Sequence, residues 1–305
     1  MKLQNLVIEY SNQMTGVTND WIQRIRYLTN NLENLYDKKI DQIKPSDISQ
    51  WIKFLQKKDF SAKTIHNKHG ALSQIFSWAV REKIITENPC LYSKLPKINQ
   101  HEMEILTVDQ YYIYLSYVPQ EYQLFIKTAF ATGARFSELT ALTKKDINLE
   151  RQTFFIHQAW SDRGKTMGPG KTAKARRSIP IHRTLFTELV DYSENLTSKS
   201  LLFTKPNGKP ITSGYCHKHI TGFAQKKMQE YYGIRFRFHD IRHTFVSWLL
   251  DFNTPVLTVS RYLGHKSAAF TLDRYGHLLK ENREHIDGLF EKISQHTSKK
   301  HIQLY

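Results

Sequence analysis

The segment EYQLFIKTAFATGARFSEL, residues 121–139, sets the pattern for the second half of the chain, because it predicts a helix that ends at a glycine. Gly133 is the residue type most often found just past a helix end, where the backbone turns left-handed. Arg135 follows this end directly, and Glu138 stands three residues later. Taken alone, the two side chains would be interpreted as a surface ion pair.

Downstream of this helix, the sequence predicts a little β-structure and then more helices. TFFIHQ (153–158) and RRSIPIH (176–182) have the composition of short strands. The Gly-, Pro- and Lys-rich stretch WSDRGKTMGPGKTAKA (160–175) joins them and is expected to be a loop. LLFTKPNGKPI (201–211) predicts another strand with a turn, and helices dominate from Thr212 onward.

Upstream, the first hundred residues predict helices and no convincing strand. PSDISQWIKFLQKK (45–58) begins with Pro45 and the capping candidates Ser46 and Asp47. SAKTIHNKHGALSQIFSWAVREK (61–83) has one apolar face, formed by Leu72, Ile75, Phe76, Ala79 and Val80. Its other face is basic, which is usually only a solvated surface but also suits phosphates; this face carries Lys63, His66, Lys68, Arg81 and Lys83.

An aperiodic stretch with scattered polar residues, about 93–104, predicts a linker between two domains. After it, Thr107 and Gln110 form a capping box that opens the next helix. We therefore predict a mainly α fold with a small β-sheet (α+β). A helical domain is expected over residues 1–98 and a mixed domain with a C-terminal tail over 105–305.

Composition limits the possible partners. The chain of 305 residues has 40% hydrophobic and 24% charged residues, no apolar run of membrane-spanning length and no signal-peptide layout. Cys90 and Cys216 are far apart and belong to no paired motif, which indicates buried thiols in a reducing compartment. We therefore expect a cytoplasmic protein with no membrane partner.

The charge is more informative, because the formal net charge is +16 and the pI is about 9.6. This much positive charge indicates a polyanionic partner, and nucleic acid is the commonest one. The basic residues are spread along the whole chain, which favours an extended binding surface over a charged tail.

Several common catalytic motifs are missing. The sequence has no P-loop, no GxGxxG motif opening a helix after a strand and no CxxC pair. His239 and His243 stand four residues apart on one helical face, but no glutamate lies between them and no third ligand is evident. We therefore expect neither a metal nor a cofactor.

Four short segments carry the residues that suit chemistry. These are ATGARFSEL (131–139), MGPGKTAKARRSIPIH (167–182), RFHDIRHTF (237–245) and LGHKSAAFTLDRYGH (263–277). In the last segment, Gly264 predicts the end of one helix, Ser267 the N-cap of the next and Tyr275 a position near its end. Each chemical residue also has a plain interpretation: Lys171 as a loop lysine, His239 with Arg242 as a helix cap and Tyr275 as core.

Taken together, the four segments resemble the tyrosine recombinase (phage integrase) family. The resemblance consists of the arginine in TGARFSEL, the KTxxxxRxIPI strand, the HxxRHTF box, the LGH triplet and a tyrosine ten residues after its histidine. Order and spacing match over roughly residues 105–285, and the N-terminal helices are less specifically similar to the family's core-binding domain. The chain begins almost directly at these helices, so a separate arm-binding domain is expected to be absent or reduced.

The chemistry of phosphodiester transfer independently asks for these residue types. Without a metal, arginines can neutralise the transition state, because a guanidinium donates bidentately to phosphate oxygens and stays charged. Arg135 and Arg242 are the candidates. A phenol such as that of Tyr275 can serve as a nucleophile that retains the bond energy in a covalent link.

The resemblance implies the remaining roles. It makes Tyr275 the nucleophile that forms a 3′-phosphotyrosyl intermediate and Lys171 the general acid for the leaving 5′ oxygen. It places His239 where a residue assists proton transfer and His265 where one hydrogen-bonds the phosphate. Glu138 matches a supporting acidic position that orients its neighbours.

Some assignments stay open. Lys165 or Lys174 could replace Lys171, which is preferred for its offset from the IPI triplet. His243 and His277 do not match motif positions and are interpreted as structural. The tail GLFEKISQHTSKKHIQLY could dock in cis or onto a neighbouring protomer through Leu289, Phe290 and Ile293.

The resemblance implies a site-specific DNA recombinase that integrates or excises a mobile element through a Holliday junction. Its implied partners are double-stranded DNA at specific attachment sites and three further copies in a homo-tetramer, with accessory DNA-bending or directionality proteins as further candidates. The alternatives are a type IB topoisomerase, a resolvase of DNA ends, or a non-catalytic DNA-binding protein on the same scaffold. His239 in the HxxR box favours the recombinase over the topoisomerase.

Overall fold

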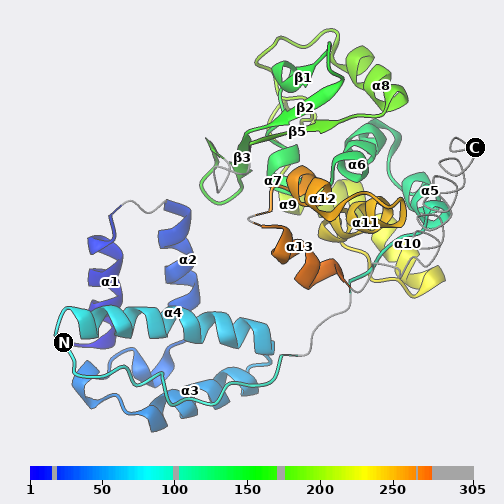
Figure 1. Cartoon of the computed structure of the whole chain (residues 1–305). Coiled ribbons are helices and arrows are strands. Elements are labelled where there is room, and N and C mark those ends of the chain that lie inside the picture. The colour runs from blue at the N-terminus through cyan, green and yellow to red at the C-terminus, as the bar shows by residue number, and fades with distance from the viewer. Residues whose placement is uncertain (16–18, 99–102, 170–175, 266, 277–305) are drawn as a thin grey trace, which may run out of the picture. The chain divides into compact units, whose positions relative to one another are not determined.

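The computed structural model describes residues 1–15, 19–98, 103–169, 176–265 and 267–276. The chain divides into two compact units, Met1–Glu102 and Met103–Tyr305, which we call the N-terminal and C-terminal units (Figure 1). In the described part of the chain, no helix combines the length and the apolar character needed to cross a membrane.

The N-terminal unit is built from helices, as predicted. The helices are α1 (Leu3–Gln13), α2 (Asn19–Thr29), α3 (Pro45–Lys57) and α4 (Ala62–Arg81), with two 3₁₀ turns at Glu33–Leu35 and Ile40–Gln42. The helix α4 packs against the other three (Figure 1). Aromatic residues such as Trp51, Phe76 and Trp78 belong to the core of this unit. Every named strand in the described residues lies in the other unit.

The cap of α3 confirms Asp47, one of the two predicted capping candidates, but not Ser46. Lys44 is the N-cap and Pro45 the first helical residue. Asp47, at the third helical position, accepts a hydrogen bond of 2.8 Å from the Lys44 backbone N–H. The carboxylate therefore reaches back over the first turn and supplies the cap, and Ser46 has no part in it.

The predicted apolar face of helix α4 is confirmed, but one residue assigned to its solvated basic face is buried. Leu72, Ile75 and Phe76 are fully buried, and Ser61 caps the helix by accepting from the Thr64 N–H. Lys68, expected on the solvated face, is only 1% exposed. It is buried because α2 ends against α4 and presents carbonyl groups of its last turn, to which Nζ of Lys68 donates.

The C-terminal unit is also mainly helical. Its helices are α5 (Val108–Ser116), α6 (Gln120–Thr132), α7 (Phe136–Leu139), α8 (Arg183–Ser193), α9 (Ser213–Cys216), α10 (Gly222–Tyr232), α11 (Phe238–Asp251), α12 (Val256–Leu263) and α13 (Ala268–Tyr275). A 3₁₀ turn at Lys144–Asp146 and one π-helical turn at His217–Thr221 complete them. The Thr107–Gln110 capping box at the start of α5 is present as predicted.

The strands form two small antiparallel sheets. The first has the order β1 (Ile147–Asn148), β2 (Thr153–Ile156), β5 (Arg177–Pro180), with Phe154 opposite Ile179. The second is a hairpin of β3 (Gln158–Ser161) and β4 (Thr166–Pro169). The fold class is thus confirmed as mainly α with a small β component.

Two local predictions about β-structure were wrong. Residues 160–169, part of a stretch expected to be a loop, contribute to the β3–β4 hairpin; its turn is closed by Ser161 accepting from the Gly164 N–H and by Lys165 at φ +49°. Residues 201–211 form isolated bridges in place of the predicted strand, Thr143 with Leu201 and Thr204 with Pro210, whereas the predicted turn is present, with the Gly208 N–H donating to the Lys205 carbonyl.

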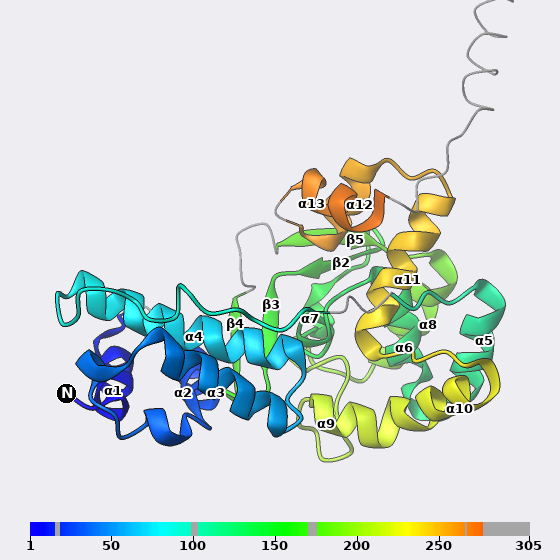
Figure 2. The same cartoon turned by 90° about the horizontal axis from the view of Figure 1, so that it is seen from below.

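The elements that carry the four motif segments pack on one another within the C-terminal unit. Helix α11 packs against α6 and α12, and α12 packs against α13 and β5. Figure 2 shows α12 and α13 lying over β5, with α11 beside them. Segments more than a hundred residues apart in the sequence therefore meet around α11 and α12.

Candidate active site

The turn between α6 and α7 holds the first pair of site residues. Gly133 ends α6 with φ +56°, and a Cβ added there would lie 2.4 Å from the Phe245 ring of α11. Only glycine suits both this backbone conformation and this close approach. Arg135 is the N-cap of α7, and its half-exposed guanidinium donates to Oε1 of Glu138 at 2.9 Å.

Glu138 is a buried bridge between two arginines, so the pair with Arg135 is not the surface ion pair that its spacing suggested. The carboxylate is 3% exposed and also accepts from Nη1 and Nη2 of Arg177, at 3.2 and 2.8 Å. Burial alone would raise the pKa of Glu138, but the hydrogen bonds and charges of Arg177 and then Arg135 outweigh it and hold the pKa below its usual range.

Arg177 received no role from the sequence, although it is one of the most buried charged residues of the site. It begins β5, is 6% exposed, and its Nε also donates to the Tyr262 carbonyl at the end of α12. One signal in the sequence could have found it. Arg177 stands two residues before Ile179, so on a strand it shares the buried face.

Arg242 is the residue at which three of the segments meet. It lies on α11, is 4% exposed, and donates from Nη1 to the Gly133 carbonyl at 2.8 Å and from Nη2 to the Leu263 carbonyl at 2.7 Å. A guanidinium has five N–H donors. The other three of Arg242 have no hydrogen-bond partner among the residues that the structure describes. Burial, and then the charge of Arg135, lower its pKa to about 9.

His265 is held by a residue that the sequence analysis did not single out. Its Nδ1 is 2.8 Å from the Thr271 hydroxyl, and both side chains are buried. Burial, and then the charges of Arg242 and other nearby arginines, lower the pKa of His265 to about 3. The imidazole is therefore neutral at pH 7.

Tyr275 ends α13, at the edge of a small hydrophobic cluster with Phe245, Val259 and Leu263. It is 2% exposed, and its hydroxyl lies 2.6 Å from Nδ1 of His243. Burial raises the pKa of Tyr275, and the charges of Arg242 and Arg274 oppose this. The predicted helix bounds, with Gly264 ending α12 and Ser267 capping α13, are present.

The two histidines of α11 are arranged differently from the prediction. His239 is exposed in the first turn, and the cap there is formed by Asp240, which accepts from the Arg237 backbone N–H at 2.7 Å. The His239 ring packs edge-on against the ring of His243 at 5.1 Å. His243, which the sequence analysis interpreted as structural, is the residue that contacts Tyr275.

Several predicted residues lie outside the described residues. These are Lys171 and its alternative Lys174, His277, and the tail residues Leu289, Phe290 and Ile293. Lys165 is described and occupies the β3–β4 turn. Within the described ranges, His, Cys, Asp and Glu side chains form no group of three that could hold a metal ion.

The structure thus brings Arg135, Arg242, His265, Tyr275 and Glu138 together, through contacts between α6–α7, α11 and α12–α13. Glu138 contacts both Arg135 and Arg177, and the contacts of Arg242 in the described part of the chain are with carbonyl groups. The site therefore has an excess of positive charge with free N–H donors. Such an arrangement binds an oxyanion such as a phosphate.

Comparisons with known proteins agree with this chemistry. Residues 101–282 match the phage integrase family, and residues 19–83 match the phage integrase N-terminal SAM-like domain. The ICEBs1 integrase of Bacillus subtilis (strain 168) is 28% identical over 298 residues, which cover 88% of this chain and 78% of that protein. The tyrosine recombinase XerC of the same organism is 27% identical over 243 residues, 73% of each chain.

Solved structures share the fold. The Tn1549 transposon integrase in complex with transposon right end DNA aligns with a TM-score of 0.79 at 23% identity, covering 90% of this chain and 95% of that one. A lambda integrase tetramer bound to a Holliday junction gives a TM-score of 0.68 at 18% identity, covering 88% and 77%. Because the phage integrase match extends over more than half of the sequence, this chain belongs to that family and is a tyrosine-type site-specific DNA recombinase.

Proposed function

We propose that this chain cuts and rejoins DNA strands at specific attachment sites through a covalent bond between Tyr275 and a 3′ phosphate, and so integrates or excises a mobile element. The observation that carries the proposal is Arg242. It is a buried guanidinium anchored between the α6 end and the α12 end, and three of its donors have no partner among the described residues. It lies on the same helix as the partner of the Tyr275 hydroxyl.

Arg135 and Arg242 act on the phosphate in this mechanism. Their guanidinium groups donate to its non-bridging oxygens and stabilise the negative charge that builds up in the pentacoordinate transition state. The carbonyl groups of Gly133 and Leu263 aim Arg242, and Glu138 aims Arg135. Because these donors are already oriented, little reorganisation is needed when the phosphate arrives.

Tyr275 supplies the attacking oxygen. Its O–P bond forms as the P–O5′ bond breaks, so the DNA backbone is held as a phosphotyrosine and neither ATP nor another energy source is consumed. His265 donates from Nε2 to the phosphate, in the tautomer in which its Nδ1 accepts from Thr271. The resemblance to the family assigns Lys171 to protonate the 5′ oxygen and His239 to assist proton transfer.

The partner in this proposal is double-stranded DNA. The net charge of +16 supports it, and so do the DNA complexes of the Tn1549 and lambda integrases. Residues 1–98 would contact DNA as the core-binding domain and residues 105–305 would carry out the chemistry. We place the protein in the cytoplasm, since its two cysteines are buried free thiols.

The proposed assembly is a homo-tetramer on two attachment sites, in which strands are exchanged in pairs through a Holliday junction. The lambda integrase structure with a tetramer on such a junction supports it, because that protein shares this fold. Accessory DNA-bending or directionality proteins complete the proposed set of partners.

A nicked duplex carrying the repeat that flanks the gene tests the mechanism. Incubated without magnesium, the wild-type protein is expected to form a covalent protein–DNA adduct that mass spectrometry maps to Tyr275, and Tyr275→Phe is expected to form none. A shift in DNA mobility without any adduct would support a non-catalytic binding protein. With two intact duplexes, exchange of labelled strands supports recombination, whereas relaxation of a supercoiled plasmid by the monomer would support a topoisomerase.

A further inference from the structure

His243 makes a short, buried hydrogen bond to the proposed nucleophile. Its Nδ1 lies 2.6 Å from the Tyr275 hydroxyl, and the two residues are 3% and 2% exposed. Their rings are 5.6 Å apart at 49°, so the contact is made through the polar atoms and not by stacking. His243 is one residue beyond Arg242 on α11, and the proposed mechanism gives it no role.

The direction of this hydrogen bond follows from the inventory of donors and acceptors. A phenol has one O–H donor, and among the described residues His243 is its hydrogen-bond partner. If Nδ1 of His243 carried a hydrogen and donated it, the buried phenol O–H would have no acceptor, which is costly. The phenol therefore donates to Nδ1, and the imidazole carries its proton on Nε2.

We propose that His243 is the proton acceptor for the nucleophile: Nδ1 holds the Tyr275 phenol by its O–H and takes that proton as the oxygen attacks phosphorus. This inference rests on the proposed function, because it assigns a residue to the first step of the same reaction. As the Tyr275 O–P bond forms, the phenolic proton moves to Nδ1 and the P–O5′ bond breaks. The 5′ oxygen receives a separate proton from the general acid. When the strand is rejoined, the proton on Nδ1 returns to the phenol oxygen.

The transfer has to accompany bond formation. In the free protein burial raises the pKa of Tyr275 and lowers that of His243 to about 4, so the phenol holds its proton far more tightly than the imidazole does. A phenol oxygen that bonds to phosphorus loses this basicity. The proton therefore leaves when attack is under way, and no phenolate forms in advance.

Bound DNA is expected to make His243 more basic, because it adds negative charge near the imidazole. Burial is the largest cause of its lowered pKa; the charges that also act on it are His239, Arg242 and Asp240 of α11 and Arg274 of α13. Asp240 alone raises the pKa, and the three other groups lower it. A DNA phosphate placed between the arginines offsets their positive charge and raises the pKa of His243, which makes it a better base only when substrate is bound.

Two variants of the full chain test the proposal on the nicked duplex. His243→Asn keeps an oxygen acceptor near the position of Nδ1 but cannot take a proton, and His243→Ala removes both functions. We expect each to bind DNA with wild-type affinity and to form the Tyr275 adduct roughly 10²-fold or more slowly, as for loss of a general base. The wild-type rate should be flat from about pH 6 to 9, whereas the variant rates should rise with pH because hydroxide must remove the proton.

A duplex with sulfur in place of the 5′ bridging oxygen distinguishes loss of the general acid from loss of the proton acceptor. A thiolate leaves without needing a proton, so this substrate bypasses the general acid alone. The sulfur substrate should restore a Lys171→Ala variant and leave His243→Asn slow. His157→Asn is the matched control; this ring of the C-terminal unit is half-buried and pairs with Asp146, and the substitution should leave the rate unchanged.

The proposal is overturned if either His243 variant forms adduct at the wild-type rate or faster, or if the sulfur substrate restores His243→Asn. A wild-type protein that forms no adduct at all would instead refute the proposed function. Circular dichroism and thermal unfolding establish that the variants are folded, and His243→Asn serves if the alanine variant is not.

Discussion

Each unit of the chain buries a cation, and the two cations are held in different ways. In the N-terminal unit, Nζ of Lys68 donates to the carbonyls of Tyr27, Leu28 and Asn30 and to Oδ1 of Asn31, at 2.9–3.4 Å. The rings of Tyr27 and Phe60 lie 5.2 and 5.4 Å from it. In the C-terminal unit, two N–H groups of Arg242 bind carbonyls and three bind nothing in the described part of the chain.

The difference separates a structural charge from a functional one. An ammonium has three donors, and four oxygens surround that of Lys68, so it has no capacity left for a ligand. Arg242 keeps donors free in a buried place where charge interacts strongly, beside a second arginine. Burial of a charge is therefore common to both residues, and only the count of unused donors identifies the binding site.

Glu138→Gln should break the C-terminal arrangement most severely. The substitution leaves the buried Arg177 without its carboxylate, and we expect a loss of about 3–5 kcal/mol in the free energy of unfolding. Urea denaturation measures it, with Glu230→Gln as a control, since the ion pairs of Glu230 with Lys226 and Lys227 lie on the surface. A loss below about 1 kcal/mol would show that water replaces the carboxylate.

The difference in stability between wild type and Glu138→Gln should depend on pH. The folded pKa of Glu138 lies below its ordinary value of 4.5, so the carboxylate stabilises the fold fully above that pH. This contribution is lost as the pH falls through the folded pKa. The difference in stability between wild type and Glu138→Gln should therefore be constant from pH 5 to 7 and shrink below about pH 4.5; a difference that is constant down to pH 3 would contradict it.

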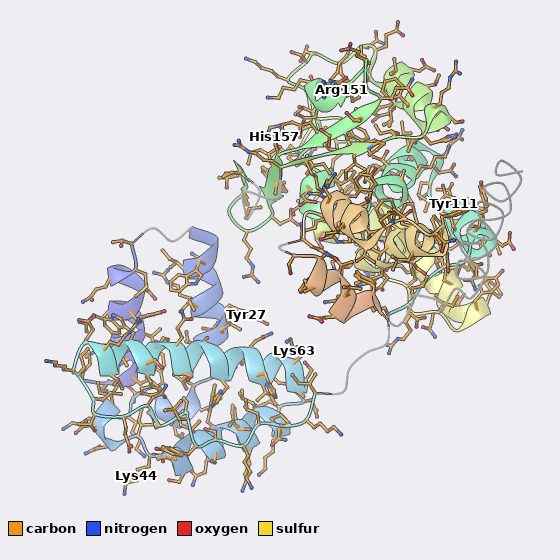
Figure 3. All side chains as sticks on the ribbon, viewed as in Figure 1. Tyr27, Lys44, Lys63, Tyr111, Arg151 and His157 are labelled. Atoms are coloured by element: carbon orange, nitrogen blue, oxygen red, sulfur yellow. The ribbon has the colours of Figure 1, made fainter. Side chains whose placement is uncertain are left out.

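Arg242→Lys should separate charge from donor geometry. Lysine keeps the positive charge but cannot hold the Gly133 and Leu263 carbonyls and a phosphate together, so we expect adduct formation to slow by roughly 10²–10³-fold, about 3–4 kcal/mol. Single-turnover kinetics at saturating DNA measure the rate. Arg151→Lys is the control, since Arg151 is an exposed arginine beside β1 and β2 (Figure 3). Wild-type rates in Arg242→Lys would mean that charge alone suffices.

Lys68→Met should lower the stability of the fold and leave the rate of adduct formation unchanged, the opposite of what we expect for Arg242→Lys. Loss of the ammonium leaves buried carbonyls at the end of α2 without donors, which we expect to cost about 1–3 kcal/mol of stability. Hydrogen exchange resolved by peptide should place the loss in the N-terminal unit, and the rate of adduct formation at saturating DNA should not change. Lys63→Met, on the exposed side of α4, is the matched control (Figure 3). A slower chemical step in Lys68→Met would remove the distinction between the two cations.

Thr271→Val should have the smallest effect of these substitutions. Valine keeps the shape of threonine but removes the hydroxyl that binds Nδ1 of His265, so we expect adduct formation to slow by about tenfold, or about 1.4 kcal/mol, with unchanged DNA affinity. Thr258→Val, on the neighbouring helix α12, controls for the loss of a hydroxyl. An equal rate in Thr271→Val would show that packing against Phe270 is enough to hold the imidazole.

Helix ends and faces could be predicted from the sequence alone, and so could the motif set that identified the family. Gly133, Gly264 and Ser267 end or cap their helices as expected, because these signals depend on residues at most a few positions apart. Arg135, Arg242 and Tyr275 were found for a different reason: their spacing matches a known family, and the chemistry of phosphate asks for their side chains.

The tertiary structure alone decided which residues meet those side chains. Lys68 stands on the polar face of α4, yet the end of α2 covers it, and His243 is next to a motif residue, yet α13 brings Tyr275 onto it. Helical periodicity gives the direction of a side chain but not the element that packs there. Backbone carbonyls, which hold both Lys68 and Arg242, carry no mark in the sequence, because every residue has one.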